Sequence, residues 1–146
     1  MNGESLTILL VEDNEDHAEI VFRTFKTHRI SNKLFHVDDG EKALNYLFEK
    51  NEYSDKTKYP TPNIILLDLR LPKIDGIEVL RNIKNDDKLK QIPVIILTSS
   101  DAEADVTKAY TNSVNSYIVK PLEYDKFVKL MENLGYYWLI WNKAPF

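Results

Sequence analysis

Ile64-Ile65-Leu66-Leu67-Asp68 is the stretch that decides the fold, because four apolar residues in a row end at a carboxylate. A continuous apolar run of this length, unlike an alternating one, is typical of a strand buried on both faces of a parallel sheet. Four other runs have the same character: Thr7–Val11, Leu34–Val37, Val94–Leu97 and Ser116–Val119. We therefore expect five strands in one parallel sheet.

Between these runs the apolar residues change to a helical period. Four stretches place such residues on one face: Ala18, Val21, Phe22 and Phe25; Ala43, Leu44, Leu47 and Phe48; Ile77, Leu80 and Ile83; Phe127, Leu130, Met131 and Leu134. A weaker helix at about 103–111 has only Val106, Ala109 and Tyr110 to bury. Strands that alternate with helices predict a doubly wound α/β fold with helices on both faces.

Two other segments have local signals of their own. The polar segment 50–63 contains Pro60 and Pro62, so we expect a long surface loop there. Asp38 and Asp39, which precede Gly40, predict a turn and a helix cap rather than a metal site.

Length and charge limit the possible classes of function. The 146 residues, 43% of them apolar, suit a single domain over 1–146 with an aromatic extension at about 135–146. A net charge of −4 argues against nucleic-acid binding. No apolar run reaches the roughly 18 residues that cross a bilayer, and the chain has no cysteine, so we expect a soluble, cytoplasmic protein without membrane contact.

Polar side chains stand where four of the predicted strands end. Glu12 and Asp13 follow the first strand, Asp68 the third and Lys120 the fifth, while Thr98 ends the fourth. Ligands of an open parallel sheet bind outside these carboxyl ends, so the five side chains should converge. Three carboxylates about 5 Å apart repel by about 3 kcal/mol per pair at an effective dielectric near 20, which favours a bound cation. Ligands that are all oxygens favour Mg²⁺.

A magnesium ion at this edge would leave room for a phosphoryl group. Asp68 could then act as a nucleophile that forms an aspartyl-phosphate, while Lys120 and Thr98 contact the phosphoryl oxygens. A single aspartate at a strand end is usually a helix cap or a loop residue. The joint placement of all these groups is what favours a site. The histidines His17, His28 and His36 are not spaced as a ligand set, and we expect them to lie at the surface or to be hydrogen-bonded.

In four ordered segments the chain resembles the response-regulator receiver domains of two-component signalling. These are residues 8–14 (ILLVEDN), 66–76 (LLDLRLPKIDG), 96–100 (ILTSS) and 117–121 (YIVKP). The resemblance implies a flavodoxin-like sheet in the order 2-1-3-4-5. It also implies that Asp68 is the phosphoacceptor and that Asp13 is a direct Mg²⁺ ligand. Glu12 would act through water, and the backbone carbonyl of Arg70 would be a further metal ligand.

The same resemblance implies how the signal is switched. Thr98 moves toward the phosphoryl group and Tyr117 fills the space left behind, unless Tyr117 is only a half-buried strand residue with one rotamer. A cis peptide bond is expected between Lys120 and Pro121. Arg70 and Ser100 flank the phosphoryl group in receivers and influence its hydrolysis, although both side chains could equally point to solvent.

The segment 52–60 and the tail 136–140 are similar to those of small stand-alone receivers that partner phytochrome-type histidine kinases. The expected function is therefore phosphoryl transfer from a sensor histidine kinase to Asp68, with output by protein contact. The alternative is a Mg²⁺-dependent phosphohydrolase that forms an aspartyl-phosphate, but Arg70 stands where such enzymes commonly have a second acid. A flavodoxin-like cofactor protein is a third possibility, and the chain lacks its phosphate loop.

The aromatic tail predicts self-association. Four large aromatic residues fall within 136–141, more than one edge of the core needs. We expect a twofold homodimer through the last helix, the strand edge around Tyr117 and this tail. The alternative is that the tail folds back onto its own domain.

Overall fold

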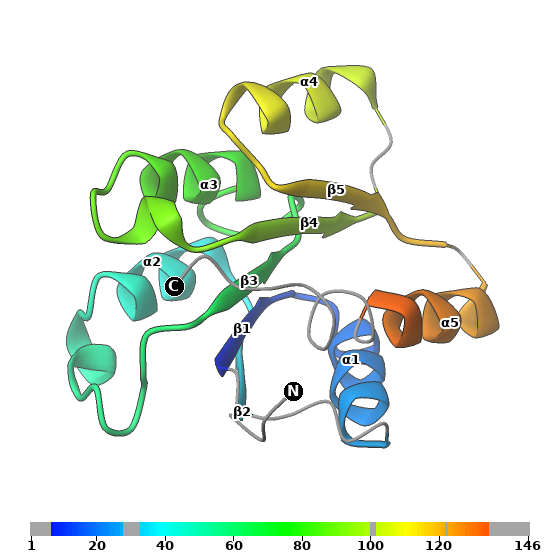
Figure 1. Cartoon of the computed structure of the whole chain (residues 1–146), viewed down its shortest axis with the longest axis horizontal. Coiled ribbons are helices and arrows are strands. Elements are labelled where there is room, and N and C mark those ends of the chain that lie inside the picture. The colour runs from blue at the N-terminus through cyan, green and yellow to red at the C-terminus, as the bar shows by residue number, and fades with distance from the viewer. Residues whose placement is uncertain (1–6, 28–32, 100–101, 122, 135–146) are drawn as a thin grey trace.

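Five strands form one parallel sheet in the computed structural model, which describes residues 7–27, 33–99, 102–121 and 123–134. The strands are β1 (Thr7–Val11), β2 (Lys33–Val37), β3 (Ile64–Leu67), β4 (Val94–Thr98) and β5 (Ser116–Val119). Their spatial order is β2-β1-β3-β4-β5, and every neighbouring pair is parallel (Figure 1). The predicted strand number, direction and order are confirmed.

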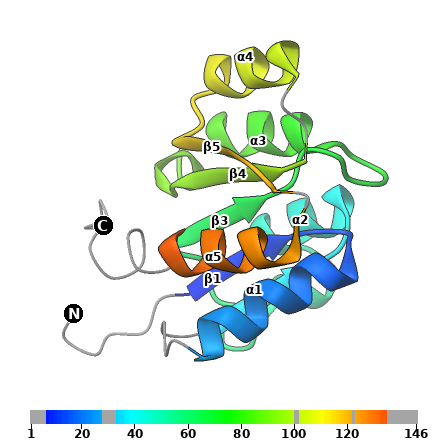
Figure 2. The ribbon, with the colours of Figure 1, turned by 90° about the vertical axis from the view of Figure 1, so that its right-hand side faces the viewer.

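Helices cover both faces of this sheet. The described α-helices are α1 (Glu15–Thr27), α2 (Gly40–Leu47), α3 (Gly76–Lys84), α4 (Glu103–Thr111) and α5 (Tyr124–Leu134). Helices α1 and α5 lie side by side over one face, and α2, α3 and α4 lie over the other (Figure 2). Among the described residues, no helix has the length and apolar character that crossing a membrane would need.

The central strands are buried on both sides. All five residues of β1 and all four of β3 are buried. Leu9, Val11 and Leu67 pack under α2 and α3, whereas Ile8 and Leu10 pack under α1 and α5. This two-sided burial is why the strand runs are apolar throughout rather than alternating.

Some expected core positions lie at the surface. Tyr110 is 54% exposed, so of the three residues expected to bury α4 only Ala109 is fully buried. Phe22 and Phe48 are also more than a third exposed. The ring of Phe22 still packs edge-on against that of His36 in β2, with centroids 6.2 Å apart.

The segment 50–63 is mostly exposed, as expected for a surface loop, but it also contacts the core. It contains the 3-10 helix η1 (Asn51–Ser54), and Tyr53 within it is buried. The rings of Tyr53, Tyr59 and Tyr46 of α2 pack with centroids 4.9–5.8 Å apart, and the Tyr46 hydroxyl donates a hydrogen bond to the Pro60 carbonyl (2.8 Å). The segment is otherwise a largely exposed loop, as expected, and the tyrosine contacts anchor it to α2.

Close backbone approaches explain two glycines at helix starts. A Cβ on Gly40 would lie 1.8 Å from the Ile74 carbonyl oxygen, and one on Gly76 would lie 2.3 Å from that of Asp68. The residue before each glycine caps the helix, as expected for Asp39, whose side chain accepts from the Lys42 N–H (2.7 Å). These contacts hold the loop after β3 against α2.

The aromatic tail at 135–146 lies outside the described residues.

Candidate functional site

Three carboxylates meet at the carboxyl edge of the sheet. Glu12 and Asp13 follow β1, Asp68 follows β3, and each offers an oxygen within 4.8 Å of the other two. Glu12 and Asp68 are buried, whereas Asp13 is exposed. The donors are all oxygens and one side of the cluster is open to water, so the residues fit a divalent cation that keeps part of its hydration shell.

Backbone hydrogen bonds fix the positions of these groups. The Glu12 N–H donates to the Val37 carbonyl and the Asp68 N–H to the Val11 carbonyl, both at 3.0 Å. The Lys120 N–H donates to the Thr98 carbonyl at 2.7 Å. The sheet ladder thus extends one residue past each strand, and the polar side chains begin on a rigid frame.

Lys120 lies within the carboxylate cluster. Its side chain is 2% exposed, and its Nζ lies 3.1 Å from Asp68 Oδ2 and also contacts Glu12 Oε1. The Lys120 Nζ is also 3.1 Å from His17 Nδ1, and the His17 ring stacks on Phe127 at 5.1 Å. His17 is hydrogen-bonded, as expected, but no signal in the sequence indicated that its partner would be Lys120.

The expected cis bond before Pro121 is wrong for this structure, which has no cis peptide among the described residues, Lys120 and Pro121 included. The trans form is the intrinsically favoured one, and the Lys120 ammonium reaches Asp68 with it.

The buried charges shift one another's titration. Burial raises the pKa of the Glu12 carboxyl to about 7, against the opposing charge of Lys120. Burial would also raise the pKa of Asp68, but the Lys120 charge and a hydrogen bond with Thr98 outweigh it and hold that pKa below its usual range. Burial and the Lys120 charge lower the pKa of His17. The Asp68 carboxyl, with its lowered pKa, is therefore ionised at neutral pH, whereas the Glu12 carboxyl, with a pKa of about 7, is only partly ionised there.

Thr98 and Tyr117 lie on the neighbouring strands β4 and β5. Thr98 is fully buried, and half-buried Tyr117 packs against the core beneath α2, α3 and α4. Tyr117 pairs in register with Ile96, two residues before Thr98. The two side chains are thus held on adjacent strands, and their coupled movement stays a prediction.

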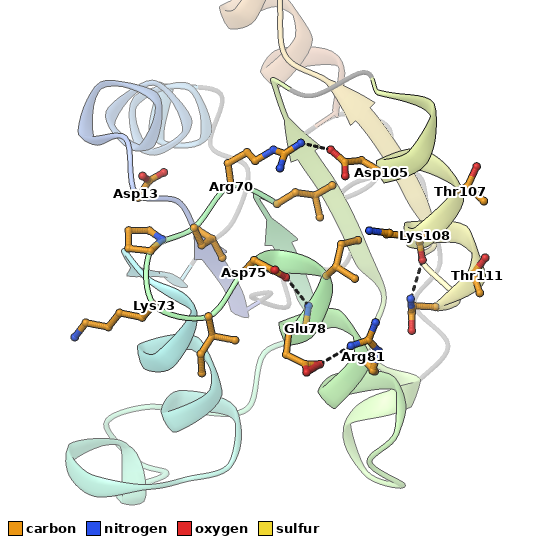
Figure 3. Close-up of a pocket in the computed structure, with 16 residues that line it drawn as sticks. Asp13, Arg70, Lys73, Asp75, Glu78, Arg81, Asp105, Thr107, Lys108 and Thr111 are labelled. Atoms are coloured by element: carbon orange, nitrogen blue, oxygen red, sulfur yellow. Dashed lines mark hydrogen bonds and ion pairs between the residues drawn. The ribbon is translucent and has the colours of Figure 1, made fainter.

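Arg70 points away from the carboxylates, toward α4. Its backbone N–H donates to Asp68 Oδ1 (3.2 Å), while its guanidinium pairs with the Asp105 carboxylate (Figure 3). The second flanking residue, Ser100, lies outside the described residues. The sequence left two orientations open for the Arg70 side chain, beside the phosphoryl group or toward solvent. In the structure the side chain is 68% exposed and pairs with a residue of α4, a partner that the sequence did not indicate.

A groove of about 960 Å³ opens beside this pair. The loop after β3, helix α3 and helix α4 form its walls, and Asp13 stands at one end (Figure 3). The loop that carries Asp68 and Arg70 therefore lies between the carboxylate cluster and α4.

Comparisons with known proteins point to one family. The family model described as response regulator receiver domain matches residues 8–132. The probable methanogenesis regulatory protein FilR2 of Methanothrix harundinacea is 43% identical over 138 residues, which cover 94% of this chain and 86% of that protein. The response regulator Rcp1 of Synechocystis is 41% identical over 132 residues, 90% of this chain and 88% of Rcp1.

Two crystal structures are similar over almost the whole chain. The Mn²⁺-bound form of Rcp1 has a TM-score of 0.91 and 39% identity, and covers 97% of this chain and 99% of its own. The phosphorylated cyanobacterial phytochrome response regulator RcpA has a TM-score of 0.92 and 34% identity, and covers 98% of this chain and all of its own. The chain therefore belongs to the response regulator receiver domain family, the signalling proteins of two-component systems.

Proposed function

We propose that Asp68 accepts a phosphoryl group from a sensor histidine kinase and that the phosphorylated protein signals through contacts with other proteins. The observation that carries this proposal is the contact between the Lys120 ammonium and the Asp68 carboxylate inside a three-carboxylate cluster. An Asp68 oxygen attacks the phosphorus of the phosphohistidine, the nitrogen–phosphorus bond breaks, and the imidazole keeps the electron pair.

The surrounding residues have distinct parts in this transfer. Lys120 and Thr98 bind phosphoryl oxygens, and Lys120 also offsets the charge that the product adds. We propose Mg²⁺ as the cation, held directly by Asp13, Asp68 and the Arg70 carbonyl and through water by Glu12. The ion would neutralise phosphoryl oxygens during transfer and during autodephosphorylation. The Mn²⁺ bound by the relative Rcp1 supports a divalent cation here.

The switch that we propose couples Thr98 to Tyr117. The phosphoryl group adds about −1.5 to −2 charges and draws the Thr98 hydroxyl inward. Tyr117 then turns into the vacated space. The half-burial of Tyr117 on the strand next to Thr98 supports this coupling.

The kinase partner that we propose is of the phytochrome type. The support is the similarity to RcpA, which is a phytochrome response regulator. Because a kinase that uses ATP is the proposed donor, we also propose a cytoplasmic location.

We further propose a homodimer through α5, the β5 edge around Tyr117 and the tail at 136–141. Three large side chains, Tyr110 of α4, Val119 of β5 and Tyr124 of α5, are each more than 40% exposed, which supports an apolar contact surface. Sedimentation at micromolar concentration, with and without phosphorylation, tests it. A monomer in both states that Trp138→Ala leaves unchanged would rule out the dimer and favour a tail packed on its own core.

Intact mass after incubation with acetyl phosphate and Mg²⁺ tests the acceptor. We expect one phosphoryl group per chain, and none without Mg²⁺ or in Asp68→Asn. Asp87→Asn is the matched control, because the Asp87 side chain is 97% exposed, and it should be labelled like the parent. Undiminished labelling of Asp68→Asn would refute the assignment.

The same labelled protein tests the phosphohydrolase alternative. A hydrolase would turn over small phosphate esters many times per chain. We expect only slow loss of the single group, since Arg70, paired with Asp105, occupies the position of the second acid.

A further inference from the structure

An ion pair joins the loop that follows Asp68 to the first turn of α4. The Arg70 guanidinium pairs with the Asp105 carboxylate across the groove between this loop and α4 (Figure 3). The Asp105 side chain is 15% exposed and the Arg70 side chain 68%. The carboxylate is thus held by the fold, whereas the guanidinium sits at the end of a long, solvated side chain that can turn.

The Arg70 side chain begins beside the proposed acceptor. Its backbone N–H donates to Asp68 Oδ1 at 3.2 Å, so rotation about its own bonds can bring the guanidinium over Asp68. A phosphoryl group there would carry more charge and more acceptor oxygens than one carboxylate. Once Asp68 is phosphorylated, the phosphoryl group and the Asp105 carboxylate would therefore compete for the guanidinium.

We propose that Asp105 competes with the phosphoryl group for Arg70 and thereby sets how long Asp68 stays phosphorylated. The inference rests on the proposed function, because it needs a phosphoryl group on Asp68. In hydrolysis a water oxygen attacks phosphorus from the side opposite Asp68, and the bond between phosphorus and the Asp68 oxygen breaks. The electron pair returns to the Asp68 carboxylate, and the proton lost by the water passes to solvent as inorganic phosphate forms.

Arg70 acts on the access of that water. Bound to the phosphoryl oxygens, the guanidinium covers the open side of the group and slows the attack. Bound to Asp105, it leaves that side open. Linkage makes the competition reciprocal, so phosphorylation also weakens the tie between the loop and α4.

The half-life of the phosphoryl group measures this competition. Chains carrying Asp105→Asn, Arg70→Gln or both are labelled with acetyl phosphate and Mg²⁺, the donor is removed, and intact mass is followed over time. We expect Asp105→Asn to lengthen the half-life about threefold, a size typical of losing a partly exposed ion pair. In the Arg70→Gln background the same change should have no effect, because Arg70 is the residue through which Asp105 acts.

The matched control is Glu78→Gln, which breaks the Arg81–Glu78 pair in the same groove. It should leave the half-life unchanged. A urea midpoint for each chain separates a lifetime effect from loosening of α4, because loosening would lower the midpoint of Asp105→Asn whereas competition for Arg70 need not.

Two results overturn the proposal while the proposed function stands. The first is that Asp105→Asn is labelled at Asp68 but loses the label with the half-life of the parent. The second is that Asp105→Asn lengthens the half-life as much in the Arg70→Gln background as in the parent. If the parent chain takes up no label at Asp68, the proposed function and this inference fail together.

Discussion

The stability of the metal-free protein should fall as the pH rises from about 4.5 to about 7, because of Glu12. Burial raises the pKa of this carboxyl from 4.5 to about 7 in the folded chain. Between these values the folded chain holds a proton that the unfolded chain has released, so the free energy of unfolding decreases with pH. The difference corresponds to at most about 3 kcal/mol, lost fully above about pH 7. His17, whose pKa is lowered, acts in the opposite sense below about pH 6.5.

The variant Glu12→Gln separates the pH dependence due to Glu12 from that due to His17, because glutamine has nearly the same shape as glutamate and does not titrate. Urea unfolding in EDTA from pH 5 to pH 8 should show a drop of about 1–3 kcal/mol in the parent that Glu12→Gln lacks. The control Glu41→Gln changes a side chain that is 57% exposed and should keep the drop. Saturating Mg²⁺ should stabilise the parent more at pH 8 than at pH 5. If Glu12→Gln and the parent have the same pH dependence, the folded site does not hold the proton on Glu12.

Four further changes test other parts of the structure. Lys120→Ala should bind Mg²⁺ almost normally, because the ammonium is not a metal ligand, yet partner binding should no longer respond to phosphorylation; a full response in a pull-down would contradict this. The Tyr117 ring resonances should change when beryllofluoride is added, and a single unchanged environment by NMR would count against the switch. Gly40→Ala should cost about 3 kcal/mol or more in urea unfolding, since a Cβ there would lie 1.8 Å from the Ile74 carbonyl oxygen. Tyr46→Phe removes the hydrogen bond to Pro60 and should cost about 1 kcal/mol, and an unchanged midpoint would show that this bond does not anchor the segment.

The sheet could be predicted from sequence because two-sided burial leaves a direct pattern in the chain. The apolar runs of β1 and β3 are continuous because helices pack on both of their faces. The exposure of Tyr110 could not be predicted in the same way. Helical periodicity tells which residues share a face, but how far the neighbouring elements extend over that face depends on the packing of the whole domain.

The contacts within the site also fall into two groups, those that the sequence predicted and those that it did not. The convergence of Glu12, Asp68 and Lys120 could be predicted, because the carboxyl ends of parallel strands lie at the same edge of the sheet whatever the rotamers of their side chains. The contacts of His17 with Lys120 and of Arg70 with Asp105 could not. These contacts depend on how α1 and α4 pack against the sheet and on side-chain rotamers. No local pattern in the chain specifies either.

The site exists only when the whole sheet has assembled. Lys120 and Glu12, which touch in the folded protein, are 108 residues apart along the chain, and β5 is the last of the described strands in chain order. A chain whose β5 has come away from the sheet keeps Asp68 but not the lysine beside it. Under the proposed function, such a chain lacks the ammonium that offsets the charge of the phosphoryl group, so we expect phosphorylation of Asp68 to require the folded sheet.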